Sequence, residues 1–298
     1  MNGARLIPLG LLGALAFGQW AAAGRSEAPF DSFGIQELFS TRPGGREWSA
    51  RWNGVDRTFT GLDPQDPWFD ADHGNGTYRV DGRGRLTATG PIVRMYVHDP
   101  DKRVEWGENL EITVYFKRVS EDRLVSYSGL QIFARTDHGT TGDENKNLCD
   151  DRGYGAKITV DGRWGFEKEI AHHRDGGSAS VATVRPWKEL PRDVSVGVKY
   201  VLRNLTHGSQ VKLELYRDLT GGRGGGQWEK ITEFVDTGTN FGLGQTSPAV
   251  GVKPELPLIR DLVLRDSENK KPMMSVYLRH EYGTMEYEKF SIREIDPL

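Results

Sequence analysis

Alternation between apolar and polar residues is the feature that most constrains what this chain can fold into. In the segments Leu110–Lys117 and Leu130–Arg135 every second residue is apolar, which is the pattern of a strand with one buried face. The pattern recurs at 196–202, 211–215, 274–278 and 287–292, and shorter candidates lie at 76–80, 84–88, 92–97 and 228–235. About a dozen such strands, separated by turn residues, predict an all-β, two-sheet antiparallel β-sandwich or jelly roll.

Composition supports this fold class and excludes several kinds of protein. The 37 glycines and the 10% of aromatic residues suit turns and strands. Cys149 is the only cysteine, so no disulfide forms within the chain. The formal net charge of -3 is not that of a nucleic-acid-binding protein. We therefore expect no nucleic-acid partner and a monomer held together by packing and hydrogen bonds.

The first residues have the pattern of an export signal. Arg5 precedes an apolar run over 6–17, and Ala21 to Ala23 offer small residues for cleavage. The run is shorter than the roughly 20 apolar residues of a membrane span. We therefore interpret residues 1–23 as a signal peptide and not as a membrane anchor. We expect a secreted protein with no membrane partner. The rest of the chain is predicted to comprise a flexible lead-in at residues 24–46 and one β-sandwich domain at residues 47–298, with a long loop at residues 61–76.

One hairpin can be predicted in detail. Alternating residues from Tyr154 to Val160 are apolar, Asp161-Gly162 is a turn sequence, and Trp164 and Phe166 follow. A loop with an odd number of residues places both apolar sets on one face. The polar face then brings Lys157 and Glu167 together as a cross-strand pair.

Polar and aromatic residues recur on the alternate face of successive strands. If that face is concave, they line a groove suited to sugars, because rings stack on pyranoses and Arg or Lys binds a carboxylate. The alternative is a solvated sheet face with no ligand. The candidate substrate-binding residues are Tyr115, Lys117, Lys157, Glu167, Lys199 and Arg279.

The segment 131–151 has the highest density of potentially functional side chains. Its acidic residues Asp143, Glu144 and Asp150 are candidate ligands for a structural calcium ion, the alternative being an ordinary polar loop. Zinc is disfavoured, because the adjacent His172 and His173 point to opposite sides of a strand.

Several motifs resemble a group of secreted microbial proteins. They are Cys149 to Lys157, Asp161-Gly162-Arg163, Phe166 to Glu169, Lys199-Tyr200, Lys212 to Tyr216 and Lys289 to Glu294. The resemblance covers roughly residues 90–295. More broadly the chain is similar to the concanavalin A-like lectin and glucanase superfamily of jelly rolls, which includes lectins, glycoside hydrolases and polysaccharide lyases.

The resemblance to jelly-roll polysaccharide lyases implies a set of catalytic residues. Gln131 resembles the glutamine of the Gln-Ile-His pattern of alginate-lyase type, although Phe133 stands where that pattern has histidine. The Glu-x-Asp-x-x-Glu pattern of retaining glucanases is absent, which disfavours a glycosidase. The candidate catalytic residues are Gln131, Arg135, His138 and Tyr277.

Three functions remain open. The first is a lyase that cleaves an acidic polysaccharide by β-elimination, in which Gln131 and Arg135 neutralise the uronate and His138 or Tyr277 moves the proton. The second is a non-catalytic carbohydrate-binding protein that uses the same groove, and the third is a structural extracellular protein. The fold alone does not separate them, and none requires a cofactor beyond the candidate calcium.

Overall fold

The computed structural model describes residues 29–101, 103–136, 152–170, 177–205, 209–243 and 275–298, together with Met1. Within these ranges it contains β-strands and one short 3-10 helix. The elements are β1 (Glu47–Ser49), β2 (Asn53–Phe59), β3 (Leu62–Asp63), β4 (Asp66–Asp70), β5 (Thr77–Arg83), β6 (Arg85–Val97), β7 (Leu110–Glu121), β8 (Gly129–Thr136), β9 (Gly153–Thr159), β10 (Trp164–Glu169), β11 (Ser178–Val184), β12 (Val196–Asn204), β13 (Val211–Asp218), η1 (Arg223–Gly225), β14 (Glu229–Asp236) and β15 (Ser275–Glu294). No helix in the described part of the chain has the length and apolarity needed to cross a membrane.

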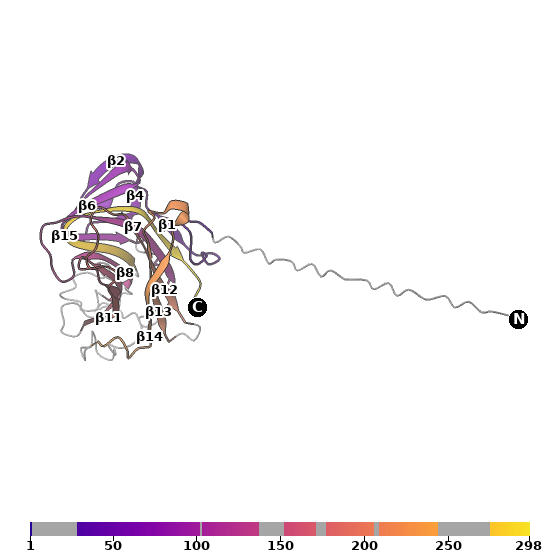
Figure 1. Ribbon diagram of the computed structural model, residues 1–298. Coiled ribbons are helices and arrows are strands. Elements are labelled where there is room, and N and C mark those ends of the chain that lie inside the picture. The colour runs from indigo at the N-terminus through magenta and orange to yellow at the C-terminus, as the bar shows by residue number, and fades with distance from the viewer. Residues whose placement is uncertain (2–28, 102, 137–151, 171–176, 206–208, 244–274) are drawn as a thin grey trace.

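The strands form an antiparallel two-layer sandwich, as the alternation predicts (Figure 1). One layer, called here the β8 sheet, runs β11-β10-β9-β8-β15-β6. The other, called the β12 sheet, runs β14-β13-β12-β7-β15. The apolar faces of both sheets pack on each other, with the rings of Phe166 and Tyr200 6.1 Å apart across the interface.

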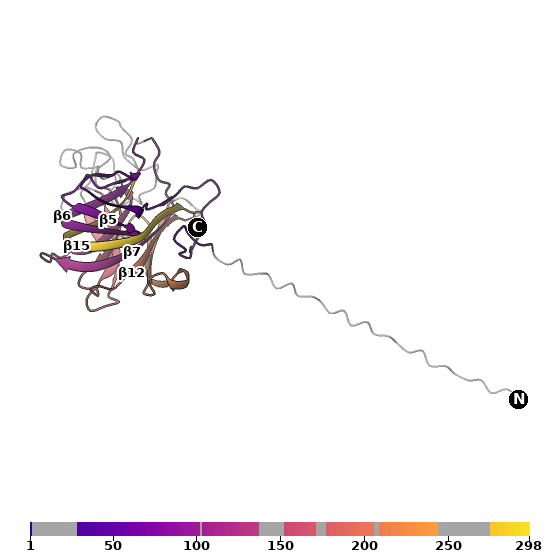
Figure 2. The same ribbon diagram turned by 90° about the horizontal axis from the view of Figure 1, so that it is seen from above.

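Strand β15 belongs to both layers. Its first residues pair with β8, its later residues pair with β7, and β6 pairs with it over 276–288. Figure 2 shows β15 lying between β6 and β7. The change of partner occurs around Tyr282, whose φ of 55° is unusual for a residue with a side chain. Pro91 stands opposite in β6 and has no amide hydrogen to give, so the strand bends there.

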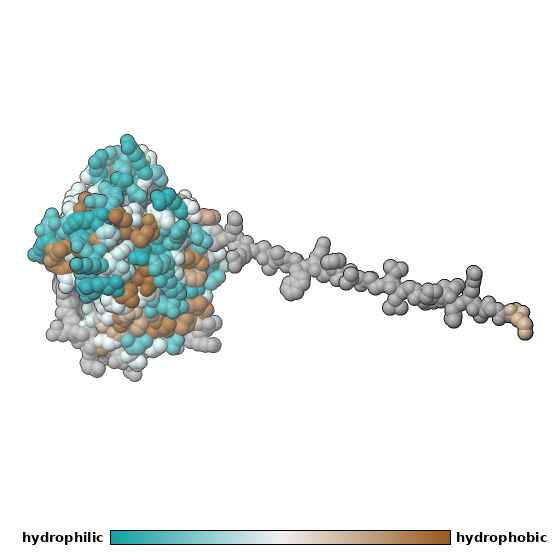
Figure 3. All heavy atoms as spheres, in the orientation of Figure 1, coloured by the Kyte–Doolittle hydropathy of each residue, from teal (hydrophilic) through white to brown (hydrophobic). Residues whose placement is uncertain are grey.

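The strand pair β2–β5 projects from the body of the sandwich (Figure 1). The first residues of β2 are exposed, and hydrophilic side chains cover the tip of this projection (Figure 3). At its base Phe59, Tyr78 and Val80 join the hydrophobic core.

The structure differs from the sequence prediction in two places, in each for a physical reason. The expected loop over 61–76 contains the short strands β3 and β4, which escape periodicity because so few residues cannot repeat a pattern. The two segments at 274–278 and 287–292 are parts of the single strand β15, in which bulges interrupt the alternation.

The N-terminal segment after residue 28 packs against the β12 sheet. Ile35 is fully buried, and Glu37 forms an ion pair with Arg293, with Oε2 and Nη1 2.7 Å apart. The Phe39 amide donates to Glu111 at 3.0 Å. This segment covers part of the outer face of the β12 sheet, because its carboxylates and amides satisfy buried charges there.

The β9–β10 hairpin has the predicted geometry. Trp164 pairs with Ile158 and the Thr159 amide donates to the Arg163 carbonyl, which leaves an odd number of residues in the loop. Gly162 in that loop has a φ of 83°. The predicted cross-strand pair is confirmed, since Lys157 Nζ lies 3.1 Å from Glu167 Oε1.

Candidate functional site

Four side chains form a row across the outer face of the β8 sheet. Gln131 of β8 pairs with Arg279 of β15 on one side and with Lys157 of β9 on the other. Arg279 pairs in turn with Arg94 of β6. We call Arg94, Arg279, Gln131 and Lys157 the cationic row. With strands about 4.8 Å apart, it spans about 14 Å.

Gln131 lies at the centre of this row. It is 2% exposed, and neither Oε1 nor Nε2 meets a hydrogen-bond partner in the part of the chain that the structure describes. Leaving a buried donor or acceptor unsatisfied costs about 1–3 kcal/mol. The amide is thus arranged to give and accept hydrogen bonds that the described residues do not supply.

Acidic side chains accompany the cations of the row. Arg94 Nη2 lies 2.8 Å and Arg279 Nη2 3.8 Å from Glu281 Oε1. Burial acts to lower the pKa of Arg279, but the charges of Tyr277, Glu281 and other acids raise it above its usual range. The guanidinium therefore stays charged, and the face offers both donors and acceptors.

A second row, of aromatic rings, lies beside the first. Tyr277 stacks on Tyr96 with ring centres 4.7 Å apart and on Phe133 with ring centres 4.9 Å apart. Gly155 makes room for Phe133, because a Cβ there would lie 2.8 Å from its ring. These rings use their faces on one another, so they do not provide the platform for sugar rings that the sequence suggested.

A hollow of about 240 Å³ adjoins the Lys157 end of the cationic row. Tyr127, Ser180 and Thr183 line it together with Lys157, and Gly165 leaves part of it free of side-chain atoms. Pockets for drug-sized ligands span roughly 300–1,000 Å³. The hollow thus has room for one unit of a larger, polymeric ligand.

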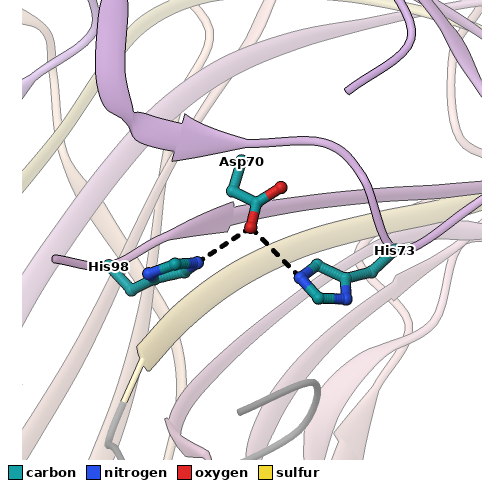
Figure 4. A group of neighbouring side chains, drawn as sticks. All are labelled: Asp70, His73 and His98. Carbon is teal, nitrogen blue, oxygen red and sulfur yellow. Dashed lines mark hydrogen bonds and ion pairs between the residues drawn. The ribbon is translucent and has the colours of Figure 1, made fainter. Parts of the chain in front are cut away.

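Two histidines and an aspartate form a cluster at the β4 end of the same face. Asp70 ends β4, His73 follows in the next turn, and His98 follows β6. Asp70 Oδ2 lies 2.9 Å from His98 Nε2 and 3.1 Å from His73 Nε2 (Figure 4). The ring of His73 packs edge-on against Tyr96 at 4.6 Å, so the cluster adjoins the aromatic row.

This cluster is electrostatically perturbed. Burial acts to raise the pKa of the Asp70 carboxyl, but hydrogen bonds from His73 and His98 hold it well below its usual range. Sequence reasoning missed the cluster because Asp70 and His73 lie in the expected loop and His98 comes from a different strand. The spacing of Asp70 and His73 was the one local signal.

The structure separates three predicted residues from this face. Tyr115, Lys117 and Lys199 lie on the outer face of the β12 sheet, since their strands β7 and β12 belong to the other layer. Tyr115 donates to Asp218 at 2.9 Å. Lys199 Nζ lies 2.6 Å from Glu111 under the N-terminal segment, and Lys117 pairs with Glu286 at 2.7 Å.

Arg135 also leaves the row, because the strand bulges at its position. Its φ of 51° and the shift of register opposite Ser275–Tyr277 turn the side chain away from Gln131. Arg135 Nε donates to the Glu108 carbonyl at 2.8 Å, and complete burial lowers its pKa. It lies near the interior of the sandwich rather than beside Gln131.

The remaining predicted residues fall elsewhere. Tyr277 and Glu167 lie on the same outer face as Gln131, in the row that Phe133 and Gly155 share. His138 and the candidate calcium ligands Asp143, Glu144 and Asp150 lie outside the described residues.

Comparison with known proteins finds similarity of structure only. No family model and no curated protein matches the sequence. Among solved structures the chain is similar to the lumenal domain of VIP36 in a Ca2+- and Man3GlcNAc-bound form (TM-score 0.44, 11% identity, covering 83% of this chain and 90% of that chain). It is also similar to winged bean acidic lectin complexed with methyl-alpha-D-galactose (0.43, 11%, 80% and 97%). A third similar structure is an alginate lyase in complex with alginate tetrasaccharide (0.41, 11%, 85% and 98%).

At such identities and TM-scores these likenesses carry no argument about what this chain does. The function has to be argued from the side chains of this chain.

Proposed function

We propose that the outer face of the β8 sheet binds an acidic polysaccharide, with the cationic row receiving a uronate carboxylate. The observation that carries this proposal is the Gln131 amide, buried between Arg279 and Lys157, whose nitrogen and oxygen find no hydrogen-bond partner among the residues that the structure describes. A carboxylate accepts from the amide nitrogen, and a neighbouring sugar hydroxyl donates to the amide oxygen.

The mixture of charges on this face favours a sugar over a simple anion. Lys157 and Arg279 are each close to a glutamate, Glu167 and Glu281 respectively. A ligand that carries both an anionic group and hydroxyl donors complements such a surface, whereas a polyanion without donors does not. The hollow beside Lys157 provides the place where one unit of the chain would enter.

The reaction that this arrangement suits is β-elimination. Gln131 and Arg279 would draw charge onto the uronate carboxylate, which acidifies the proton on the adjacent C5 carbon. Tyr277, two residues from Arg279 on the same face, would remove that proton as general base, with His138 as the alternative. The electron pair forms the C4–C5 double bond and the C4–O4 bond breaks, and the residue that took the C5 proton gives it to the leaving O4.

The proposal also includes the setting of the protein. Polysaccharides of this class lie outside cells, so the segment 1–23 would act as a signal peptide with cleavage after Ala23, and the mature chain would be a monomer. N-terminal sequencing of protein secreted by an expression host tests the cleavage, and an unprocessed Met1 in the secreted fraction would contradict it.

Binding and cleavage are tested together with a panel of alginate, glucuronan, pectate, heparin-type and neutral glycans. Ultraviolet absorbance of the unsaturated uronyl product reports a lyase, and retardation in glycan-containing gels without product reports a non-catalytic binder. We expect an acidic glycan to give product. Absence of both signals on every glycan would leave a structural role and overturn the proposal.

A matched pair of variants locates the site. Lys157→Gln should weaken binding at least about tenfold, because its ammonium lies in the cationic row. Lys117→Gln is the control, since Lys117 also pairs with one glutamate at similar exposure but lies on the other sheet. Equal effects of the two changes would remove the β8 sheet from the site.

A further inference from the structure

We propose that Asp70, His73 and His98 form a binding site for a zinc-type divalent transition-metal ion. One oxygen of Asp70 and the Nε2 atoms of the two histidines converge on one point, as Figure 4 shows, and a ligand atom from each residue lies within 4.8 Å of the others. Asp70 and His98 are buried, while His73 is partly exposed. This inference does not depend on the proposed glycan site.

The hydrogen bonds around His98 orient its ring towards Asp70. His98 Nδ1 lies 2.8 Å from the Asp99 carbonyl oxygen, which can only accept, so Nδ1 carries a hydrogen. Nε2 then faces Asp70 Oδ2 at 2.9 Å. A metal ion would bind to these two atoms, with the backbone carbonyl as the outer partner that orients the histidine ligand.

The spacing of the ligand atoms fits such an ion after a small adjustment. Bond lengths of about 2.0–2.2 Å place tetrahedral ligand atoms about 3.3–3.5 Å apart. Asp70 Oδ2 lies 2.9 and 3.1 Å from the two nitrogens, and all three ligand atoms lie within 4.8 Å of one another, so rotation of the side chains would bring them to these distances around one ion. The side chain of His73 is 30% exposed, which leaves room for water as a further ligand.

The ligand types choose the class of metal. Two imidazoles and one carboxylate suit zinc and its transition-metal neighbours, whereas calcium binds six to eight oxygens. The site therefore differs in both residues and metal from the calcium site suggested for Asp143, Glu144 and Asp150.

The test uses the metals alone on the full-length chain after treatment with a chelator. We expect calorimetry to show zinc binding that His73→Asn weakens at least about tenfold, and cobalt to give visible absorption bands of a histidine-ligated ion that the variant loses. Calcium in excess should not displace either ion. His73 is partly exposed, so this variant folds even if the buried His98→Asn does not.

Asp72→Asn is the matched control, because it removes an exposed carboxylate from the same turn and keeps the backbone amide that donates to Asp70. It should bind zinc as the unchanged chain does. The proposal is overturned if the unchanged chain binds no zinc, or if His73→Asn retains the same affinity and the same cobalt spectrum, which would place the metal on other histidines.

Discussion

At the scale of single residues, Gln131 shows how a side chain can be unfavourable for folding and useful for binding. Its amide is buried without partners among the described residues, and its neighbours across the strands are charged. A fold selected for stability alone would place an apolar residue there. The unfavourable free energy of burying this amide is explained if a bound ligand completes the hydrogen bonds of Gln131.

Replacing Gln131 with methionine separates these two effects. Gln131→Met should raise the free energy of unfolding by about 1–2 kcal/mol, because it removes an unsatisfied amide at nearly constant volume. Acidic-glycan binding should fall sharply. Urea denaturation measures the first effect, and the exposed Gln227→Met serves as control, with an expected change within about 0.5 kcal/mol. A destabilised Gln131→Met would show that the amide has partners in the folded state.

His280 makes the stability of the protein sensitive to pH. Burial, reinforced by Arg94, lowers its pKa from 6.5 to about 4, so the folded state keeps the ring neutral. The unfolded chain binds a proton as the pH falls below 6.5, and the folded chain does so only near 4. The contribution of this residue to the free energy of unfolding is therefore fully present above pH 6.5. It declines by up to about 3 kcal/mol as the pH falls towards 4.

The measurement is the free energy of unfolding from pH 7 to pH 4, for the unchanged chain and for His280→Gln. The difference between the two curves should shrink as the pH falls, because the variant has no imidazole to protonate. A difference that is constant over this range would mean that His280 does not titrate between the two states.

At the scale of elements, the glycines of β9 shape the outer face of the β8 sheet. Gly155 lies under the ring of Phe133, and a Cβ there would approach its ring atoms to 2.8 Å. The aromatic row is packed closely on both sides of Tyr277, so it cannot yield easily. The absence of a side chain at Gly155 of β9 therefore lets the aromatic row keep its position on the sheet.

Gly155→Ala should therefore lower the free energy of unfolding by about 1–3 kcal/mol and weaken glycan binding. Gly61→Ala is the control, since its nearest neighbour would lie at an ordinary 3.4 Å, and it should be close to neutral. Thermal unfolding measures both variants. Equal stability of the two would show that Phe133 moves aside freely.

At the scale of the whole molecule, a buried ion pair joins the two layers. Lys168 of β10 and Asp236 of β14 lie 2.8 Å apart, both fully buried, and Tyr154 of β9 donates to the same carboxylate at 2.6 Å. The edge strands meet nearby, where Thr232 Oγ1 donates to the Ala182 carbonyl at 3.0 Å. This polar contact fixes one sheet against the other where apolar packing alone would permit sliding.

Removing one partner should be costly. Asp236→Asn leaves the Lys168 ammonium buried without its counter-charge and should lower the free energy of unfolding by about 3–5 kcal/mol. Adding Lys168→Met should restore part of that loss. The control is Glu229→Gln, which removes an exposed carboxylate from its ion pair with the largely buried Arg217 and should cost about 1 kcal/mol or less. Denaturant titration measures the free energy of unfolding of each variant. A small loss of stability for Asp236→Asn would mean that water reaches Lys168.

Much of the fold could be predicted because alternation is local. The strands containing Gln131 and Lys157 and the pair Lys157–Glu167 follow from residues close together in the chain. Arg135 could not be placed, because a bulge reverses the alternation without any local sign. The same holds for β15, where Tyr282 and Lys289 with positive φ interrupt the pattern.

Local alternation predicted the all-β class, most of the strands and, away from the bulges, which side chains face the core, because burial of one strand face imposes a period of two. Which strands are neighbours was settled by tertiary packing. It placed Arg279 beside Gln131, and His98 beside Asp70, and it sent Lys199 to the opposite sheet. The physical reason is that pairing between distant segments depends on the packing of both whole layers, which no local pattern encodes.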